Sequence, residues 1–363
     1  ITVTNDGSTI PVEKYEGGND WTPTLTFSAF FSGSNFDDQK ERRWGGRFGI
    51  GVKAVGTWSS RFEVECCDVT RGKRFRQSWD SNMSVVHPPK VTSYKAKRSS
   101  TTVKFIPDYA RLEMQHVLDS GMPESLYHAL ASKVYDACVC TRPDLTVSLD
   151  GKKLGLRSLQ QYSVALGGIG PFAQDVVHDS EGREVFRVCI AARSAETDAA
   201  AVGFVNGIRC SAGTHIDMLW RAVAQIVTHK ARAKSKDAQL AIKPAMVKNE
   251  VVAVVVSLVP NPEFSSQTKD TLTTPCKGFK FAWTPSASFV NALERSELVE
   301  RAIHGARGNE SKSLEKTTKV TRGPVHVDKL DDARLAGKKG GDCTLLVTEG
   351  DSAKAFAVAG LSV

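Results

Sequence analysis

Residues 45–53 form the glycine-rich stretch of the sequence that is best suited to holding phosphate. The stretch reads Gly45-Gly46-Arg47-Phe48-Gly49-Ile50-Gly51-Val52-Lys53 and leads into a helical run. Small residues there leave backbone N–H groups bare at a helix N-terminus, where oriented amides and the helix dipole attract anions. Arg47 and Lys53 add positive charge. Because Lys53 stands between Val52 and Ala54, this is not a Walker A loop, and a purely structural glycine turn is the alternative.

Three polar side chains that precede this stretch are candidate nucleotide contacts. Asp6 follows an expected N-terminal strand in an Asn-Asp-Gly turn, where its carboxylate can accept a hydrogen bond from an adenine amino group. The alternative is an ordinary Asx turn. Ser34 and Asn35 can reach a sugar hydroxyl or a phosphate. Their alternative role is helix capping.

Two further candidate ligand sites lie farther along the chain, on a strand and on a loop. Thr101 opens an expected strand, and its hydroxyl can bind adenine directly or through a water, although most strand threonines are structural. Gln267 and Lys269 belong to a Gln-Thr-Lys loop. A lysine on a mobile loop can reach a phosphate as a point charge, and a solvated loop lysine is the alternative.

Glu349 is the candidate for metal chemistry near the end of the chain. It follows the apolar run 345–348 at a glycine turn, which predicts a carboxylate at the carboxyl end of a buried strand. Open α/β sheets place ligands at that edge, and a carboxylate there can hold magnesium or move a proton in phosphoryl transfer. The alternative is a simple helix start that Asp351 caps.

The elements that must position these residues differ along the chain. In the first 157 residues, short alternating runs and glycine-rich loops predict strands mixed with helices. The expected strands are 1–4, 62–65, 102–105 and 145–149, and the expected helix is 124–138.

Residues 158–306 have a different order of elements. Their pattern predicts strand, strand, helix, strand and helix, which is typical of a βαβ unit on a mixed sheet. The expected strands are 185–191, 201–205 and 251–259, and the expected helices are 215–234 and 286–303. Residues 307–341 are charged and rich in lysine and glycine, so we predict a linker, followed by a strand at 343–348 and a helix after residue 351.

Composition narrows the class of protein. With 363 residues, 41% of them hydrophobic, the chain can form two or three folded domains. The net charge of +8 suits a polyanionic partner such as nucleic acid, or a merely soluble basic protein. Eight cysteines without paired C-x-x-C knuckles argue against zinc and for a reducing compartment. No apolar run is long enough for a membrane span.

The motifs, in this order, resemble one family, the type IIA DNA topoisomerases of the eukaryotic topoisomerase II kind. The resemblance covers essentially the whole chain. It is carried by Asn5-Asp6-Gly7, Gly46–Lys53, Thr101–Phe105 with Pro107-Asp108, Phe204–Ile208 with Gly213–Asp217, Gln267–Lys269, Lys329–Ala333 and Glu349–Ala353.

The resemblance implies a fold and a set of domains. We expect an α+β chain: a GHKL (Bergerat) ATPase sandwich lacking its N-terminal part at 1–157 and a βαβ transducer of ribosomal-protein-like fold at 158–306. A linker at 307–341 and the first strand and helix of a TOPRIM domain at 342–363 would follow. By the resemblance, the ATPase glutamate and a magnesium-binding asparagine would precede Ile1, and the DNA-linking tyrosine would follow Val363.

The resemblance also implies a function. The chain would be the ATP-binding and transducer part of an ATP-dependent DNA topoisomerase that passes one duplex through a transient double-strand break in another. ATP and Mg²⁺ would be its cofactors, and double-stranded DNA and a second copy of the parent protein its partners. The implied catalytic residues are Lys269, at the terminal phosphate, and Glu349, at magnesium. Its compartment would be the nucleus, or alternatively a mitochondrion or another DNA-containing organelle.

Several departures and alternatives accompany this resemblance. Thr9 stands where the family often has glycine, Phe48 where eukaryotic members usually carry asparagine, and Ile50 where tyrosine is usual. Thr9 and Phe48 leave a non-catalytic nucleotide-binding module as an alternative. A chaperone-like or mismatch-repair GHKL ATPase is another alternative, against which the Glu349-Gly350-Asp351 turn argues. The basic stretch 229–236 can be a solvated helix end or a contact to DNA.

Overall fold

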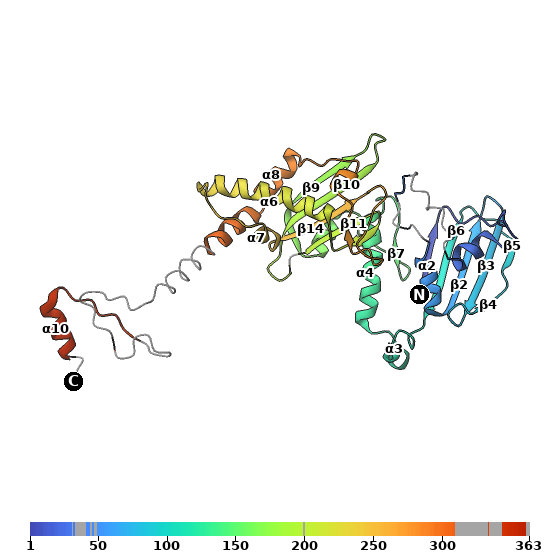
Figure 1. Ribbon diagram of the computed structural model, residues 1–363, viewed down its shortest axis with the longest axis horizontal. Helices are drawn as coiled ribbons and strands as arrows, with labels where there is room; N and C mark the ends of the chain where they lie inside the picture. The colour runs from blue at the N-terminus through green and yellow to red at the C-terminus, as the bar shows by residue number, and fades with distance from the viewer. Residues whose placement is uncertain are drawn as a thin grey trace. The chain divides into compact units, whose positions relative to one another are not determined.

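The computed structural model describes residues 1–30, 32, 41–43, 46, 49–198, 200–308, 333 and 343–360 (Figure 1). The chain divides into two compact units, Ile1–Ala306 and Arg307–Val363. Most of the predicted linker and the expected Lys329–Ala333 motif, apart from Ala333, lie outside the described residues.

The first unit begins with a six-stranded antiparallel sheet. Its strand order is β1-β6-β2-β3-β4, with β5 also beside β3. The strands are β1 (Thr2–Asp6), β2 (Ser59–Asp68), β3 (Lys73–Asp80), β4 (Val85–Val86), β5 (Lys90–Ser93) and β6 (Ser100–Pro107). The expected strands at 1–4, 62–65 and 102–105 are thereby confirmed. Alternation along β2 and β3 directs Phe62, Phe75 and Trp79 into one core cluster, while charged residues occupy the opposite face.

Two short helices accompany the core side of this sheet. They are α1 (Thr22–Ser28) and α2 (Gly51–Thr57). Phe27 of α1 and Val52 of α2 join the same core cluster, so burial of apolar area holds both helices against the strands. The glycine stretch thus leads into α2, as predicted.

A long helix connects the first sheet to the second one. After α3 (Gln115–Ser120), helix α4 runs over Glu124–Cys140 and confirms the expected helix. The strand expected at 145–149 is wrong in length, because only β7 (Ser148–Leu149) pairs with β8 (Lys152–Lys153). The pairing is limited to this hairpin, whose turn places Asp150 and Gly151 at positive φ.

The second sheet has five strands in the order β12-β11-β14-β10-β9. Its strands are β9 (Gly168–His178), β10 (Glu184–Arg193), β11 (Ala200–Val205), β12 (Ile208–Cys210) and β14 (Val251–Ser257). β11 and β14 are parallel, whereas the other pairs are antiparallel. Helix α6 (Thr214–Ser235) lies between β11 and β14 in sequence, which confirms the predicted βαβ unit on a mixed sheet.

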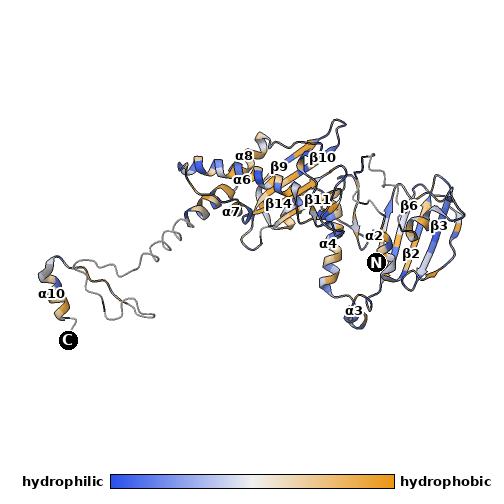
Figure 2. Cartoon of the chain, in the orientation of Figure 1, coloured by the Kyte–Doolittle hydropathy of each residue, from blue (hydrophilic) through white to orange (hydrophobic). Residues whose placement is uncertain are grey.

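Strand β14 is buried along its whole length because both faces of the second sheet are covered. Figure 2 shows the hydrophobic colouring along this strand. Ala253 and Val255 belong to the cluster beneath α6 and α8 (Ala287–Arg295). Val254 and Val256 belong to the cluster beneath α5 (Leu159–Ala165) and the end of α4.

Smaller elements complete the first unit, and one of them corrects a prediction. These elements are β13 (Ala212–Gly213), α7 (Pro244–Lys248), β15 (Thr271–Leu272) and the 3-10 turn η1 (Cys276–Gly278). The single helix expected at 286–303 is wrong, because α8 ends before Ser296, and a second helix occupies 298–308. Ser296 is extended, donates its hydroxyl to Leu293 O and accepts from Leu298 N–H, so it ends one helix and caps the next.

In the second unit, helix α10 (Gly350–Gly360) agrees with the expected C-terminal helix. The strand expected at 343–348 is wrong in this structure, since these residues form no ladder. Leu345, Leu346 and Val347 are 76%, 60% and 80% exposed. A strand exists through hydrogen bonds to a neighbour, and no other strand is described in this unit.

Candidate functional site

The inner face of the first sheet, which carries its apolar core, ends in a group of polar side chains. Asn5, Thr101 and Cys66 are partners in register across β1, β6 and β2. Directly paired residues share one face of a sheet, and Val64 and Val103, two positions away, belong to the core cluster. The three polar residues therefore extend the inner face toward the end of the strands.

Asp6, which the sequence selected as the adenine ligand, alternates to the opposite face of β1. Its partner in register is Ser100, and its Oδ2 accepts a 2.8 Å hydrogen bond from Arg98. The structure thus brings Asn5, rather than Asp6, together with Thr101. Strand alternation carried through to the Asn-Asp-Gly turn would have found Asn5, because side chains two positions apart on a strand point to the same side.

A hydroxyl from Thr9 completes this polar group. Its Oγ1 lies 2.8 Å from the Oγ1 of Thr101 and donates to the carbonyl of Ser100 at 3.1 Å. The Cys66 thiol beside them is fully buried. Burial raises the pKa of Cys66 to about 12, although the polar hydroxyls of the two threonines oppose the shift. The thiol therefore keeps its proton at neutral pH.

The buried lysine of α2 is the second part of the site. Gly49 has a φ of 60°, and the helix then begins at Gly51, with no side chain capping its first turn. Lys53 is only 2% exposed, and its Nζ donates to Ser32 Oγ at 3.1 Å. Burial lowers the pKa of Lys53. Ile50 is the residue that precedes the helix.

Four predicted ligand residues around this helix are outside the described part of the chain. They are Ser34, Asn35, Arg47 and Phe48. Their predicted roles at the sugar and the phosphates stay predictions, as does the effect of phenylalanine at position 48.

The third part of the site is the loop that carries Lys269. Its side chain is half-buried and its φ is 61°, in a turn where its N–H donates to Ser266 O at 3.1 Å. Burial and, to a lesser degree, the positive charge of Arg42 lower the pKa of Lys269. Gln267, two residues earlier, is exposed. The loop thus holds an ammonium group next to a second cation.

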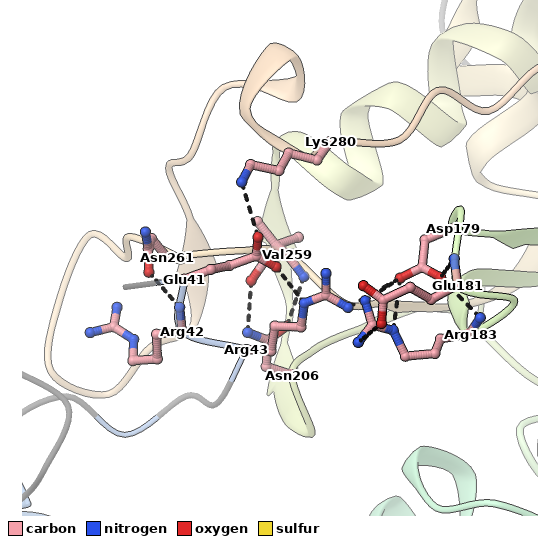
Figure 3. A network of polar contacts seen from close by, with 10 residues as sticks. All are labelled: Glu41, Arg42, Arg43, Asp179, Glu181, Arg183, Asn206, Val259, Asn261 and Lys280. Atoms are coloured by element: carbon pink, nitrogen blue, oxygen red, sulfur yellow. Dashed lines mark hydrogen bonds and ion pairs between the residues drawn. The ribbon is translucent and has the colours of Figure 1, made fainter. Parts of the chain in front are cut away.

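Residues Glu41 to Arg43, shortly before the glycine stretch, connect to the loops of the second sheet (Figure 3). The backbone N–H of Arg42 donates to Asn261 Oδ1 at 2.9 Å, and the N–H of Asn261 returns a 2.8 Å bond to Arg42 O. The guanidinium of Arg43 donates to Asp179 Oδ2 at 3.1 Å, and Lys280 pairs with Glu41 at 3.0 Å. We call residues 41–43 the clasp segment.

Comparison with known proteins places this geometry in a family. A family profile described as DNA gyrase B matches residues 160–320. The probable DNA topoisomerase 2 of Dictyostelium discoideum is 35% identical over the whole chain, and that of Saccharomyces cerevisiae is 32% identical. The chain belongs to the type IIA DNA topoisomerase family. It spans about a quarter of those topoisomerases, 24% and 26% of their respective lengths.

Solved topoisomerase II structures confirm the predicted α+β fold. The ATPase region of the Saccharomyces cerevisiae enzyme superposes with a TM-score of 0.73 at 28% identity, over 84% of this chain and 76% of that chain. The ATPase and transducer domains of Balamuthia mandrillaris topoisomerase II give 0.72 at 27% identity, over 85% and 77%. The first sheet with its helices is accordingly the GHKL ATPase fold of topoisomerase II, and the second sheet is its transducer.

Glu349, the metal ligand expected from the topoisomerase resemblance, is exposed at the start of α10. Among the residues that the structure describes, no three histidine, cysteine, aspartate or glutamate side chains form a cluster that could hold a metal. The predicted role of Glu349 at magnesium therefore stays a prediction.

The basic end of the transducer helix α6, within residues 229–236, makes ion pairs and a hydrogen bond to other residues of this chain. Lys230 pairs with Glu294 at 2.6 Å, Lys234 pairs with Glu300, and Arg232 Nε donates to Leu240 O at 3.2 Å. These contacts favour the interpretation of residues 229–236 as a helix end, whose charges are neutralised locally, over a contact to DNA. No helix in the described residues is long and apolar enough to cross a membrane.

Proposed function

We propose that the chain binds ATP on the inner face of its first sheet and transmits the presence of the terminal phosphate to the transducer. Lys53 supports this proposal most strongly. Its ammonium group is almost fully buried, and a hydroxyl is its one hydrogen-bond partner among the described residues. A buried cation without a carboxylate is costly, so an anionic ligand such as phosphate would stabilise it.

The other residues of the site would each contact a different part of the nucleotide. Asn5 and Thr101 present an amide and a hydroxyl on one face, which suits the edge of a purine. The amides of Gly49 to Gly51 lead into α2 beside Lys53 and suit the phosphates. Lys269 with Gln267, on the transducer loop, would contact the terminal phosphate, because an added anion would offset the repulsion between Lys269 and Arg42.

We also propose that residues 342–363 begin a TOPRIM domain and that this domain binds magnesium. Magnesium is commonly held by one or two carboxylates together with phosphate oxygens. Glu349 would supply one such carboxylate, at the magnesium that the topoisomerase resemblance assigns to DNA cleavage. Bound magnesium would supply charge neutralisation for phosphoryl transfer.

The whole protein would be an ATP-dependent topoisomerase that passes one DNA duplex through a transient break in another. This follows from relatives named DNA topoisomerase 2 that match over the full chain. Double-stranded DNA and a second copy of the protein, joined through the ATPase domains, are the proposed partners. The nucleus is the proposed compartment, with a mitochondrion or another DNA-containing organelle as the alternative, and imaging of the tagged protein tests it.

Calorimetric titration of this chain with Mg-ATP tests the proposed site. We expect Lys53→Ala to weaken binding roughly 10- to 100-fold, because a charge-assisted hydrogen bond to phosphate is lost. Lys104→Ala is the matched control, since Lys104 is exposed on the opposite face of the same sheet and should keep its affinity.

Two outcomes would change the proposal. If the unmodified chain binds no ATP, the nucleotide site is wrong. If ATP binds but the complete parent protein fails to relax supercoiled DNA, the alternative of a non-catalytic GHKL nucleotide-binding module is correct.

A further inference from the structure

We propose that Thr9 makes the hydroxyl of Thr101 a pure hydrogen-bond acceptor, so that this site selects a purine with a 6-amino group over one with a 6-oxo group. Thr9 would be a positioning residue that acts through Thr101. The inference rests on the proposed ATP site, and it commits to a direct contact between Thr101 and the base.

The Thr9 hydroxyl has two oxygen neighbours and one proton to share between them. Thr9 Oγ1 is within hydrogen-bond distance of Ser100 O, at 3.1 Å, and of Thr101 Oγ1, at 2.8 Å. A hydroxyl has one proton, and a carbonyl oxygen can only accept. The bond to Ser100 therefore uses the proton of Thr9, and Thr101 must donate in the bond between the two hydroxyls. The proton of Thr101 is thereby directed at Thr9 and away from any ligand.

The oxygen of Thr101 stays available to a ligand. A hydroxyl oxygen has two lone pairs, and the proton that Thr101 donates to Thr9 uses neither of them. Thr101 can therefore accept a hydrogen bond from a ligand while its own proton is held by Thr9.

Asn5 cannot make this selection alone. A side-chain amide carries both a donor and an acceptor, and a rotation by half a turn exchanges them. Asn5 can therefore satisfy either an amino group or an oxo group. The selectivity falls on Thr101, its partner in register. An oxo group that meets an oxygen without an available proton leaves a buried acceptor unsatisfied.

Position 9 makes this arrangement specific to chains with a hydroxyl there. Where the family often has glycine, no side chain would receive the proton of the threonine on the neighbouring strand. That hydroxyl could then rotate to donate or to accept. Thr9 removes this freedom, since its two contacts occupy both its proton and one of its lone pairs.

The test compares the binding of Mg-ATP and Mg-ITP to the full 363-residue chain, because hypoxanthine replaces the 6-amino group with an oxo group. We expect the unmodified chain to prefer ATP roughly 10- to 100-fold. Thr9→Val should bring the two dissociation constants to within about threefold of each other, chiefly through tighter ITP binding, since Thr101 regains a free proton. Thr9→Ser should keep the preference.

Thr4→Val is the matched control. Thr4 and Thr102 form the same kind of hydroxyl pair, at 3.0 Å, between the same two strands on the opposite face. The ratio of the ITP and ATP dissociation constants of Thr4→Val should equal that of the unmodified chain. If Thr9→Val folds poorly, judged by its thermal midpoint, Thr101→Val replaces it and should remove the preference by weakening ATP.

The outcomes separate this inference from the proposed function. An unmodified chain that binds neither nucleotide overturns both. A chain that binds ATP, but whose preference over ITP is absent or survives the loss of the Thr9 or Thr101 hydroxyl, overturns the inference alone. A preference that disappears in Thr9→Val and persists in Thr9→Ser and Thr4→Val supports it.

Discussion

At the scale of single residues, His215 is the side chain whose burial has the clearest consequence for stability. It lies in the first turn of α6, fully buried, and neither ring nitrogen has a hydrogen-bond partner. Gly203 of β11 makes room for it, because a Cβ there would approach the imidazole Nε2 within 2.1 Å. Burial lowers the pKa of His215 from 6.5 to about 4, so the folded chain holds it neutral.

We predict that His215 makes the chain sensitive to acid. Its pKa is depressed on folding, so its neutral form contributes fully above pH 6.5, and this contribution is lost as the pH falls toward 4. Relative to His215→Gln, which does not titrate, the free energy of unfolding should decrease by about 3 kcal/mol between pH 7 and pH 4. Urea unfolding at several pH values measures this difference.

The control is His229→Gln, since His229 is exposed on the same helix. Its difference from the unmodified chain should stay nearly constant over the same range of pH. A constant difference for His215→Gln as well would mean that the imidazole is solvated or finds a partner in solution.

At this scale, the sequence predicted the identity of several site residues better than their environment. Lys53, Thr101 and Lys269 could each be selected by residue type; the structure buries Lys53 and pairs Thr101 with Asn5, and the roles of all three at a nucleotide stay predictions. The position of Asn5 beside Thr101 was not predicted, because the side on which a strand residue points depends on alternation and pairing, which a turn motif does not show. The contact of Thr9 with Thr101 joins residues 92 positions apart, so local pattern could not reveal it.

At the scale of elements, the clasp segment links the chain before the glycine stretch to the transducer loops. Asp179 accepts bonds from the backbone and side chain of Arg183 and from Arg43, and these bonds, foremost the backbone N–H of Arg183, hold its pKa well below the usual range. A depressed pKa means that the link is present above pH 4 and is lost on further acidification.

We predict that Asn261→Ala loosens this segment without unfolding the sheets. The substitution removes the acceptor of the Arg42 N–H, so amide exchange at residues 41–43 should become faster at neutral pH. Hydrogen-exchange mass spectrometry measures this change, with peptides from β14 as the internal reference. Asn206→Ala is the contrasting variant, because its bonds to Val259 lie within the transducer.

Unchanged exchange at residues 41–43 in Asn261→Ala would show that the clasp is held by its ion pairs alone. Arg43→Ala should then produce the loosening. Its effect on the denaturation midpoint should be small, since ion pairs with partly exposed partners contribute little.

The elements themselves were predictable where burial is periodic or continuous. Helices α4 and α6 and strand β14 each bury a regular face or a whole apolar run, and all three appear close to their expected bounds. The break at Ser296 was not predictable from apolar spacing, because a single hydroxyl replaces backbone bonds there. The strand expected at 343–348 depends on partners that apolarity alone cannot supply.

At the scale of the whole molecule, the net charge of +8 raises the question of which cations remain available to a polyanion. Lys230 and Lys234, at the basic end of α6, are held by Glu294 and Glu300 in local ion pairs. A paired ammonium group contributes less to the neutralisation of DNA phosphates than an unpaired one. The local pairs therefore reduce the electrostatic attraction that the sequence suggests.

We predict that the double substitution Glu294→Gln and Glu300→Gln strengthens binding to a DNA duplex. The two released ammonium groups should make the slope of log affinity against log salt concentration more negative by up to about 1.8. Each phosphate that a cation neutralises contributes roughly 0.9 to this slope. Fluorescence anisotropy with a labelled duplex at several salt concentrations measures the slope. Glu181→Gln, on the Asp179 hairpin, removes one exposed acidic charge elsewhere and is the control for net charge. A slope that changes equally in both variants would indicate that the end of α6 does not face DNA, whereas a change confined to the double variant would locate the DNA contact there.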